Sequence, residues 1–153
     1  MQERSYVVTG RTLLGEDLRE EDVSITVSRG IITAIEPSFE VPDRWIVPAF
    51  FNAHTHLGDT VAMDLPARGS LAALVKPPNG LKHRILAATP RADLVRGMRS
   101  SIMTMAATGT TGFADFREGG ADGVAALREA AAGLGLTPVA GRVADREEDR
   151  SVL

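Results

Sequence analysis

The sequence contains no cysteine, and this absence excludes disulfide bonds, thiolate metal ligands and a cysteine nucleophile. It also lacks an excess of basic charge, because 17 lysine and arginine residues stand against 20 acidic residues and leave a formal net charge of -3. That balance argues against a protein that binds nucleic acid through bulk positive charge. We therefore expect no nucleic-acid partner.

Long hydrophobic runs are missing as well. The longest one, around residues 46–53, is broken by Pro48 and Asn52, whereas a membrane-spanning helix needs about 20 apolar residues. The first residues, from Met1 to Arg4, show no basic segment that leads into an apolar stretch, so the sequence predicts no secretory signal peptide. These features predict a cytoplasmic protein without a membrane partner.

The composition that remains is that of an ordinary globular protein, with 44% hydrophobic and 24% charged residues. The 153 residues suffice for one domain with a sizeable core. The residue pattern nevertheless changes at Pro48, so we predict two structural parts, residues 1–47 and residues 48–153.

The first part has the pattern of a small antiparallel β unit. Val23, Ile25 and Val27 alternate with polar residues, which is typical of a half-buried strand. Arg29 and Gly30 then provide a turn, and an apolar stretch rich in isoleucine follows it. The sequence therefore predicts a hairpin over residues 22–36.

The second part alternates between strand and helix patterns, and its predicted fold class is α/β. The elements expected in it are strands near residues 49–54, 110–116 and 136–142, and helices near residues 90–108 and 120–133. Such an alternation predicts a parallel sheet built from right-handed crossovers, with the two helices covering one side.

A long connection, residues 57–88, follows the first of these strands and is rich in glycine and proline. Loops of this length are usually functional or disordered. Thr89 is predicted to cap the N-terminus of the helix that follows, and Gly109 is predicted to end that helix.

Two of the three histidines, His54 and His56, lie at the end of the first strand of the second part. Side chains alternate along a strand, so both imidazoles are predicted to point to one side, with Cα atoms about 6.5 Å apart. Two imidazoles at that separation can converge on one cation, and neutral imidazole suits zinc and iron(II). The alternative is that the two histidines lie near each other in a loop by chance, without a metal. The position at a strand end favours the metal site.

The segment from Val47 to Asp59, with Asn-Ala-His-Thr-His at its centre, resembles the metal-binding segment of the amidohydrolase superfamily. The asparagine before Ala-His-Thr-His is more similar to the deaminase and chlorohydrolase branch. Residues 29–35 resemble part of the N-terminal β-sandwich of the family, and residues 109–116 resemble its second barrel strand. Ala49 departs from the glycine that the family usually has there.

This resemblance implies both a fold and a chemistry. Residues 1–47 would be a portion of a β-sandwich, and residues 48–153 would be the first three βα units of a TIM-type barrel, whose complete form takes roughly 250 residues. A divalent metal, zinc before iron, would be held by His54 and His56. The implied reaction is the hydrolysis of a C–N bond, such as a deamination, in a small nitrogenous compound by a metal-bound hydroxide.

The later parts of the family's site have no counterpart in this sequence. The family adds histidines after two later barrel strands, an aspartate after the last strand and, in many deaminases, a glutamate proton shuttle. His83 matches none of these positions. The resemblance therefore implies the N-terminal part of an amidohydrolase, inactive alone and without a catalytic residue of its own. The alternative is a non-catalytic remnant, or one piece of a split protein, that acts through association with a partner chain.

Other polar residues near the strand ends are weaker candidates. Asp59 and Asp115 are predicted to bind substrate or to orient a metal ligand, because the strand ends of such barrels carry function. The alternative for Asp59 is a loop cap. Arg117 and Glu118 are predicted to form a surface pair, and His83 is predicted to lie on a solvated face.

Association is the last expectation. Three strands cannot close a barrel, so the inner face of the predicted sheet would stay uncovered and its edges unpaired. We therefore expect self-association, or a complementing chain that carries the rest of the barrel, in addition to a small-molecule substrate.

Overall fold

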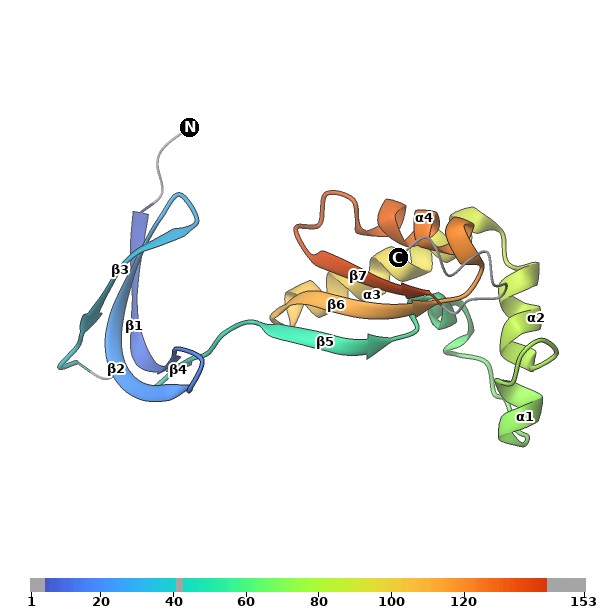
Figure 1. Cartoon of the computed structure of the whole chain (residues 1–153), viewed down its shortest axis with the longest axis horizontal. Helices are drawn as coiled ribbons and strands as arrows, with labels where there is room; N and C mark the ends of the chain where they lie inside the picture. The colour runs from blue at the N-terminus through green and yellow to red at the C-terminus, as the bar shows by residue number, and fades with distance from the viewer. Residues whose placement is uncertain (1–4, 41–42, 143–153) are drawn as a thin grey trace. The chain divides into compact units, whose positions relative to one another are not determined.

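The computed structural model describes residues 5–40 and 43–142. The chain divides into two compact units, Met1–Pro48 and Ala49–Leu153, and each unit is described by itself (Figure 1). The mixed α/β character predicted from the sequence is confirmed, because an all-β unit precedes a unit of alternating strands and helices.

The first unit is a four-stranded sheet in the order β3-β2-β1-β4. Its strands are β1 (Ser5–Leu14), β2 (Arg19–Ser28), β3 (Ile31–Pro37) and β4 (Trp45–Ile46). The first three pair antiparallel, as predicted, but β4 runs parallel to β1. The expectation of a wholly antiparallel unit is therefore wrong for β4. A crossover takes the chain from β3 to the opposite edge of the sheet, and a crossover permits parallel pairing.

The predicted hairpin in this unit is confirmed. Arg29 and Gly30 connect β2 to β3, with φ angles of 53° and 78°. Positive φ at both central residues is the backbone of the two-residue turns that match the twist of paired strands. Val23 and Ile25 are buried, as their alternation with polar residues predicts.

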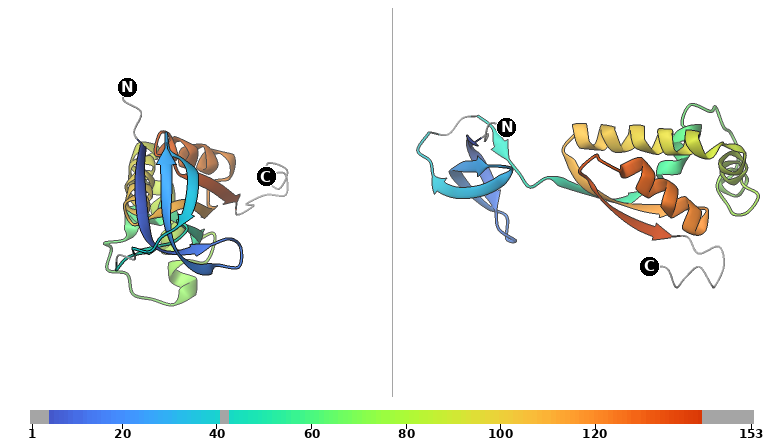
Figure 2. Two further views of the ribbon diagram at one scale, coloured as in Figure 1. Left: turned by 90° about the vertical axis from the view of Figure 1, so that its left-hand side faces the viewer. Right: turned by 90° about the horizontal axis from the view of Figure 1, so that it is seen from above.

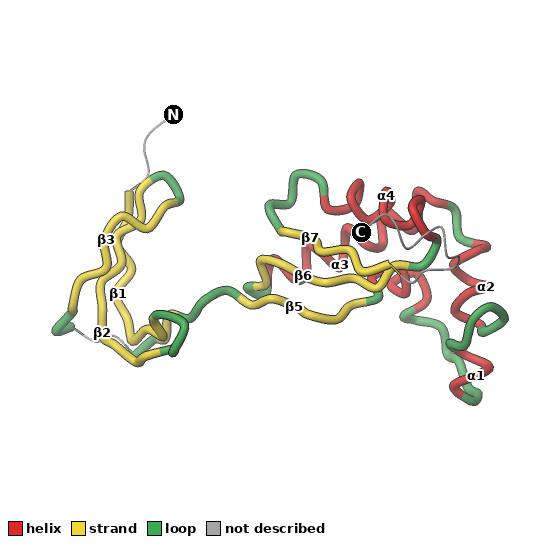
Figure 3. The backbone as a smooth tube through the Cα atoms, in the orientation of Figure 1, coloured by secondary structure: helices red, strands yellow, loops and turns green. Residues whose placement is uncertain are grey.

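The second unit contains a three-stranded parallel sheet in the order β5-β6-β7. Its elements in chain order are β5 (Phe50–Thr55), the 3-10 helix η1 (Leu57–Ala62), α1 (Leu71–Leu74), α2 (Leu81–Ala88), α3 (Arg91–Ala107), β6 (Thr110–Arg117), α4 (Gly120–Ala131) and β7 (Thr137–Arg142). The three strands run side by side in the tube drawing (Figure 3). The predicted order of strands and their parallel pairing are confirmed.

The prediction of a long loop over residues 57–88 is wrong, since η1, α1 and α2 all lie within this segment. The predicted cap of α3 is wrong as well. Pro90 is its N-terminal cap, and Thr89 instead ends α2 by donating its hydroxyl to the carbonyl oxygen of Ile85 at 2.8 Å. The reason is local: a residue before proline is pushed out of the helical region, so Thr89 is extended. Gly109 ends α3 at φ 89°, as predicted.

Both long helices cover one face of the parallel sheet (Figure 2, right). Phe113 on β6 is completely buried against Met98 and Ile102 of α3 and Leu127 of α4. Phe116 points to the face of β6 opposite to that of Phe113, and it is 37% exposed. On β5, Phe50 and Phe51 are 61% and 54% exposed. The sheet therefore has one covered face and exposed aromatic surface elsewhere.

Within residues 5–40 and 43–142, no helix combines the length and apolar character needed to cross a membrane.

Candidate metal site

His54 and His56 stand at the carboxyl end of β5, where the strand passes into η1. Their rings lie on the same side of the chain, as the two-residue spacing predicts, with ring centroids 5.2 Å apart. The two Nε2 atoms approach to 3.3 Å. Thus the two ring nitrogens that could bind a cation converge on one point.

This separation fits a divalent cation. Two nitrogens bound at about 2.0–2.1 Å in a tetrahedral arrangement lie about 3.3–3.4 Å from each other. The Nε2 atoms of His54 and His56 already stand at such a distance. Because His54 is exposed and His56 is partly exposed, a cation could reach both nitrogens from solvent.

Phe116 of β6 supports both imidazoles. Its ring centroid lies 4.5 Å from that of His54 and 5.9 Å from that of His56, with tilted ring planes. Contacts of this kind between aromatic rings favour a fixed orientation. Phe116 therefore provides an apolar surface that helps to hold the two ligands in place.

The described part of the chain adds no further ligand to this pair. No group of three histidine, cysteine, aspartate or glutamate side chains that could hold a metal exists within it. Catalytic zinc usually has three protein ligands and a water. The two histidines therefore supply part of a ligand set.

Asp115 lies in the interior, with no exposed surface. Its Oδ1 accepts hydrogen bonds from the backbone N–H of Leu57 at 2.6 Å and from the hydroxyl of Thr55 at 2.9 Å. Both donors flank His56 in the sequence. Asp115 therefore fastens the histidine segment to β6, and its contacts are with protein groups rather than with the space in front of the imidazoles.

Arg117 and Glu118 do not form the predicted surface pair. The side chain of Arg117 is 4% exposed and that of Glu118 is 14% exposed. Arg117 donates to Asp115 Oδ2 at 3.2 Å and to Glu118 Oε2 at 2.6 Å. Gly58 makes room for this buried guanidinium, because a Cβ at that position would collide with it. The correction follows from strand geometry, since residue 117 shares the covered face of β6 with Phe113 and Asp115.

Lys82 of α2 joins this charged group to the histidines. Its ammonium lies 2.6 Å from Glu118 Oε1, 2.9 Å from Asp59 Oδ2 and 3.4 Å from His56 Nδ1. The same Glu118 oxygen is 3.7 Å from His56 Nδ1. A helix that the sequence predicted as loop therefore contributes a cation to the neighbourhood of the site.

The charges in this group stabilise one another. Burial disfavours the ammonium of Lys82, but its hydrogen bonds to Glu118 and Asp59 outweigh this effect and raise the pKa of Lys82. Burial likewise disfavours the carboxylate of Glu118, yet the hydrogen bond from Lys82, a backbone hydrogen bond and the charge of Arg117 lower the pKa of Glu118. Both side chains are thus held in their charged forms.

Asp59 lies close to the histidines, as its position in the sequence predicts, but its side chain is bound to Lys82. Its second oxygen, Oδ1, is buried and has no hydrogen-bond partner. Asp59 also borders a cavity of about 240 Å³ together with Lys82 and residues of α1 and α2. Its predicted role in substrate binding therefore remains a prediction.

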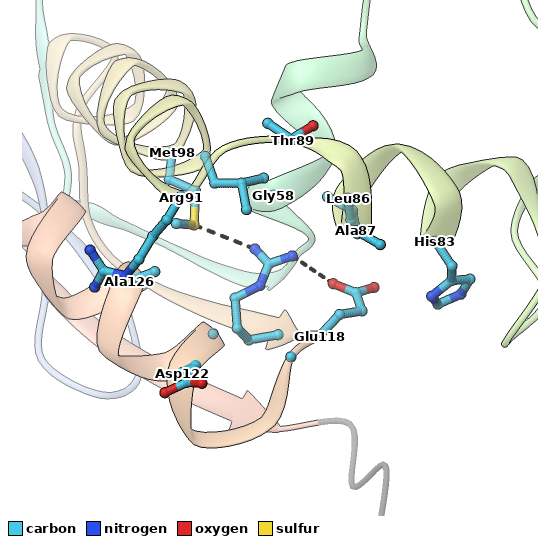
Figure 4. Close-up of a pocket in the computed structure, with 14 residues that line it drawn as sticks. Gly58, His83, Leu86, Ala87, Thr89, Arg91, Met98, Glu118, Asp122 and Ala126 are labelled. Atoms are coloured by element: carbon cyan, nitrogen blue, oxygen red, sulfur yellow. Dashed lines mark hydrogen bonds and ion pairs between the residues drawn. The ribbon is translucent and has the colours of Figure 1, made fainter.

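His83 is separate from the two histidines of the candidate site. Its Nε2 lies 3.1 Å from the carbonyl oxygen of Val75. It borders a larger cavity of about 390 Å³, on whose walls Gly58, Met98, Glu118 and Asp122 also lie (Figure 4). Neither His54 nor His56 lines this cavity. This cavity and the convergent imidazoles are therefore different places in the second unit.

Comparison with known proteins identifies the protein family to which the chain belongs. The profile of the amidohydrolase family matches residues 45–151, so the chain belongs to the amidohydrolase family. A candidate aminohydrolase of Methanothermobacter thermautotrophicus is 39% identical over 148 residues, which cover 92% of this chain and 38% of that protein. The chain therefore spans well under half the length of this curated relative.

Solved structures show the same fold at lower identity. The structure of a triazine hydrolase from Arthrobacter aurescens matches with a TM-score of 0.64 and 23% identity. The match covers 92% of this chain and 36% of the triazine hydrolase chain. The structure of atrazine chlorohydrolase from Arthrobacter aurescens in complex with zinc matches with a TM-score of 0.60 and 21% identity. The match covers 89% of this chain and 35% of the chlorohydrolase chain.

Proposed function

We propose that this chain supplies the first part of a metal-dependent amidohydrolase, with His54 and His56 as ligands of a divalent cation. The observation that carries the proposal is the 3.3 Å approach of their Nε2 atoms at the end of β5, inside the segment that the family profile matches. Zinc is the cation we expect, with iron(II) as the second choice, because neutral imidazole suits both. A cytoplasmic location is proposed from the sequence alone.

The proposed architecture has two parts. Residues 1–47 would belong to the β-sandwich of such an enzyme, and β5, β6 and β7 with their helices would be the first three βα units of its barrel. The parallel order β5-β6-β7 supports this assignment. So does the position of the histidines, because working groups in barrels stand at the carboxyl ends of the strands.

The chemistry we propose is the hydrolytic removal of an amino group, or another C–N hydrolysis, in a small nitrogenous compound. A divalent cation would supply Lewis acidity that activates water and polarises the substrate. His54 and His56 would bind that cation, and Phe116 would hold their rings. Asp115 would fix the hydroxyl of Thr55 between them and the backbone N–H of Leu57 after them. The name of the Methanothermobacter relative supports deamination, and that of the zinc-containing chlorohydrolase supports a metal.

We propose further that the 153-residue chain does not turn over substrate by itself, since the described residues supply two ligands and no third. The complementary strands would come from the same polypeptide or from a second chain. The exposed Phe50, Phe51 and Phe116 support this dependence, because exposed apolar surface of this kind favours association. The same surface is what favours the alternative, a non-catalytic piece that acts through a partner chain.

The experiment joins the chain to the portion of the Methanothermobacter relative that it does not cover, in cis or as a co-expressed chain. Ammonia release from amino-substituted purines, pyrimidines and triazines is then screened with zinc present. We expect release with the joined protein, none with the 153-residue chain, and none after His56→Ala. His83→Ala is the matched control and should retain release.

Two outcomes would contradict the proposal. Turnover that survives His56→Ala would remove His56 from the metal site. Chloride release from chlorotriazines without ammonia release would replace deamination by a chlorohydrolase reaction.

A further inference from the structure

The Nδ1 atom of His56 has two charged neighbours that are also bound to each other. Lys82 Nζ is 3.4 Å away and Glu118 Oε1 is 3.7 Å away, and these two atoms are 2.6 Å apart. Nothing in the proposed chemistry uses this arrangement. It nevertheless determines which partner the second nitrogen of a metal-binding histidine can have.

The two neighbours differ in what they can do for an imidazole. An ammonium group only donates hydrogen bonds, so Lys82 can face Nδ1 only while that nitrogen presents its lone pair. The hydrogen of His56 is then on Nε2, directed toward His54 Nε2 at 3.3 Å. A cation held by Nε2 requires the lone pair there, which moves the hydrogen to Nδ1. Nδ1 then needs an acceptor, and Lys82 cannot serve as one.

Glu118 can serve as that acceptor. Among the residues that the structure describes, it supplies the carboxylate oxygen within ion-pair distance of His56 Nδ1. It is also held firmly, because Lys82 binds one of its oxygens and Arg117 donates to the other at 2.6 Å. Histidine ligands of metals commonly donate their other ring N–H to such a carboxylate, which fixes the ring and increases the basicity of the ligand.

We infer that Glu118 is a positioning residue for His56, which accepts its Nδ1–H when a cation is bound, and that Lys82 occupies this place when no cation is bound. The inference rests on the proposed metal site. In the change between the two states, one hydrogen moves from Nε2 to Nδ1 of His56. Lys82 retains Asp59 as a partner throughout, at 2.9 Å.

The test compares two substitutions that remove the same charge. Glu118→Met and Glu118→Gln both abolish the ion pairs with Lys82 and Arg117, but only glutamine keeps an oxygen that can accept from Nδ1. Zinc affinity of the 153-residue chain is measured by titration calorimetry with zinc chloride. We expect Glu118→Met to lose about 10- to 100-fold in affinity and Glu118→Gln to lose clearly less. A role of Glu118 through its charge alone predicts equal losses, and equal losses would overturn the inference.

Lys82→Met adds a variant with the opposite expectation. It breaks the same ion pair with Glu118, yet it removes the competing donor at Nδ1. We expect its zinc affinity to equal or exceed that of the unmodified chain, while its thermal unfolding midpoint falls. A loss of zinc affinity as large as that of Glu118→Met would count against the inference.

A measurement on the unmodified chain tests the inference even if a variant fails to fold. The chain has three histidines, so the side-chain ¹⁵N spectrum is simple, and His56 can be assigned. We expect the hydrogen of His56 on Nε2 without zinc and on Nδ1 with zinc. A hydrogen that stays on one nitrogen in both states would overturn the inference. Absence of any zinc binding by the unmodified chain would instead refute the metal site itself, and with it the inference.

Discussion

The carboxylate of Asp115 accepts a hydrogen bond from the backbone N–H of Leu57 at 2.6 Å. This contact joins the end of β6 to the residue directly after His56, so the position of the second histidine depends on a buried group 58 residues beyond Leu57. The covered face of the sheet therefore fixes the histidine segment.

The first prediction concerns Asp115 itself. Asp115→Ala removes the acceptor for Leu57 and Thr55 and leaves the buried guanidinium of Arg117 without this partner. Removal of one member of a buried ion pair costs about 3–5 kcal/mol, so we expect the free energy of unfolding to fall by about that amount. Urea denaturation followed by circular dichroism measures it.

Glu129→Gln is the control for Asp115→Ala. Glu129 pairs with Arg91 on the surface, with both side chains more than half exposed. Exposed ion pairs contribute about 0–1 kcal/mol, so this variant should unfold nearly as the unmodified chain does. Equal effects of the two substitutions would show that Asp115 has no special importance for stability.

The second prediction concerns Gly58. A methyl group there would collide with the Arg117 guanidinium, which is enclosed and bound to Asp115 and Glu118, so it cannot easily move aside. We expect Gly58→Ala to lower the free energy of unfolding by about 1–3 kcal/mol. Gly30→Ala provides a comparison, because Gly30 has open space around it and only its φ of 78° opposes a side chain. A thermal unfolding midpoint of Gly58→Ala equal to that of the unmodified chain would contradict the packing described here.

The sequence predicted the order of strands, their parallel pairing and the shared side of His54 and His56, because periodicity and spacing are local properties. It failed where the outcome depended on neighbours far along the chain. Residues 57–88 were predicted as a long connection with His83 on a solvated face, yet the neighbouring Lys82 is largely buried by its contact with Glu118.

Arg117 could have been predicted better. It lies two residues beyond Asp115 and four beyond Phe113, so alternation places all three on one face. Once Phe113 is expected in the core, a buried charged pair at the end of β6 follows. Glu118 comes after the end of the strand, so alternation does not extend to it.

The third prediction concerns the stability of the chain at acid pH. The pKa of Glu118 is lower in the folded chain than its ordinary value of 4.5, so its contribution to stability is complete above that value. It is lost as the pH falls through the lowered folded pKa. We therefore expect the chain to lose stability below about pH 4.5, and Glu118→Gln to lose less over the same range. Denaturant unfolding at pH 7 and at several acid pH values tests this, and parallel curves for both proteins would refute it.

The fourth prediction concerns association. The aromatic surface at Phe50, Phe51 and Phe116 favours contact with another chain. The outer edges of β5 and β7 favour it too, because no strand among residues 5–40 and 43–142 pairs with them. We expect the 153-residue chain to sediment as oligomers or aggregates, and Phe51→Lys to reduce their size. A monodisperse monomer with a cooperative melting transition would show that this surface is tolerated in solution.

The central claim is that His54 and His56 together bind a divalent cation. Zinc titration of the 153-residue chain, monitored by calorimetry, tests it most directly, with His56→Ala as the test variant and His83→Ala as the matched control. We expect weak binding of one zinc ion per chain, unchanged by His83→Ala and abolished by His56→Ala. Zinc binding that is equal in His56→Ala and in the unmodified chain would contradict it.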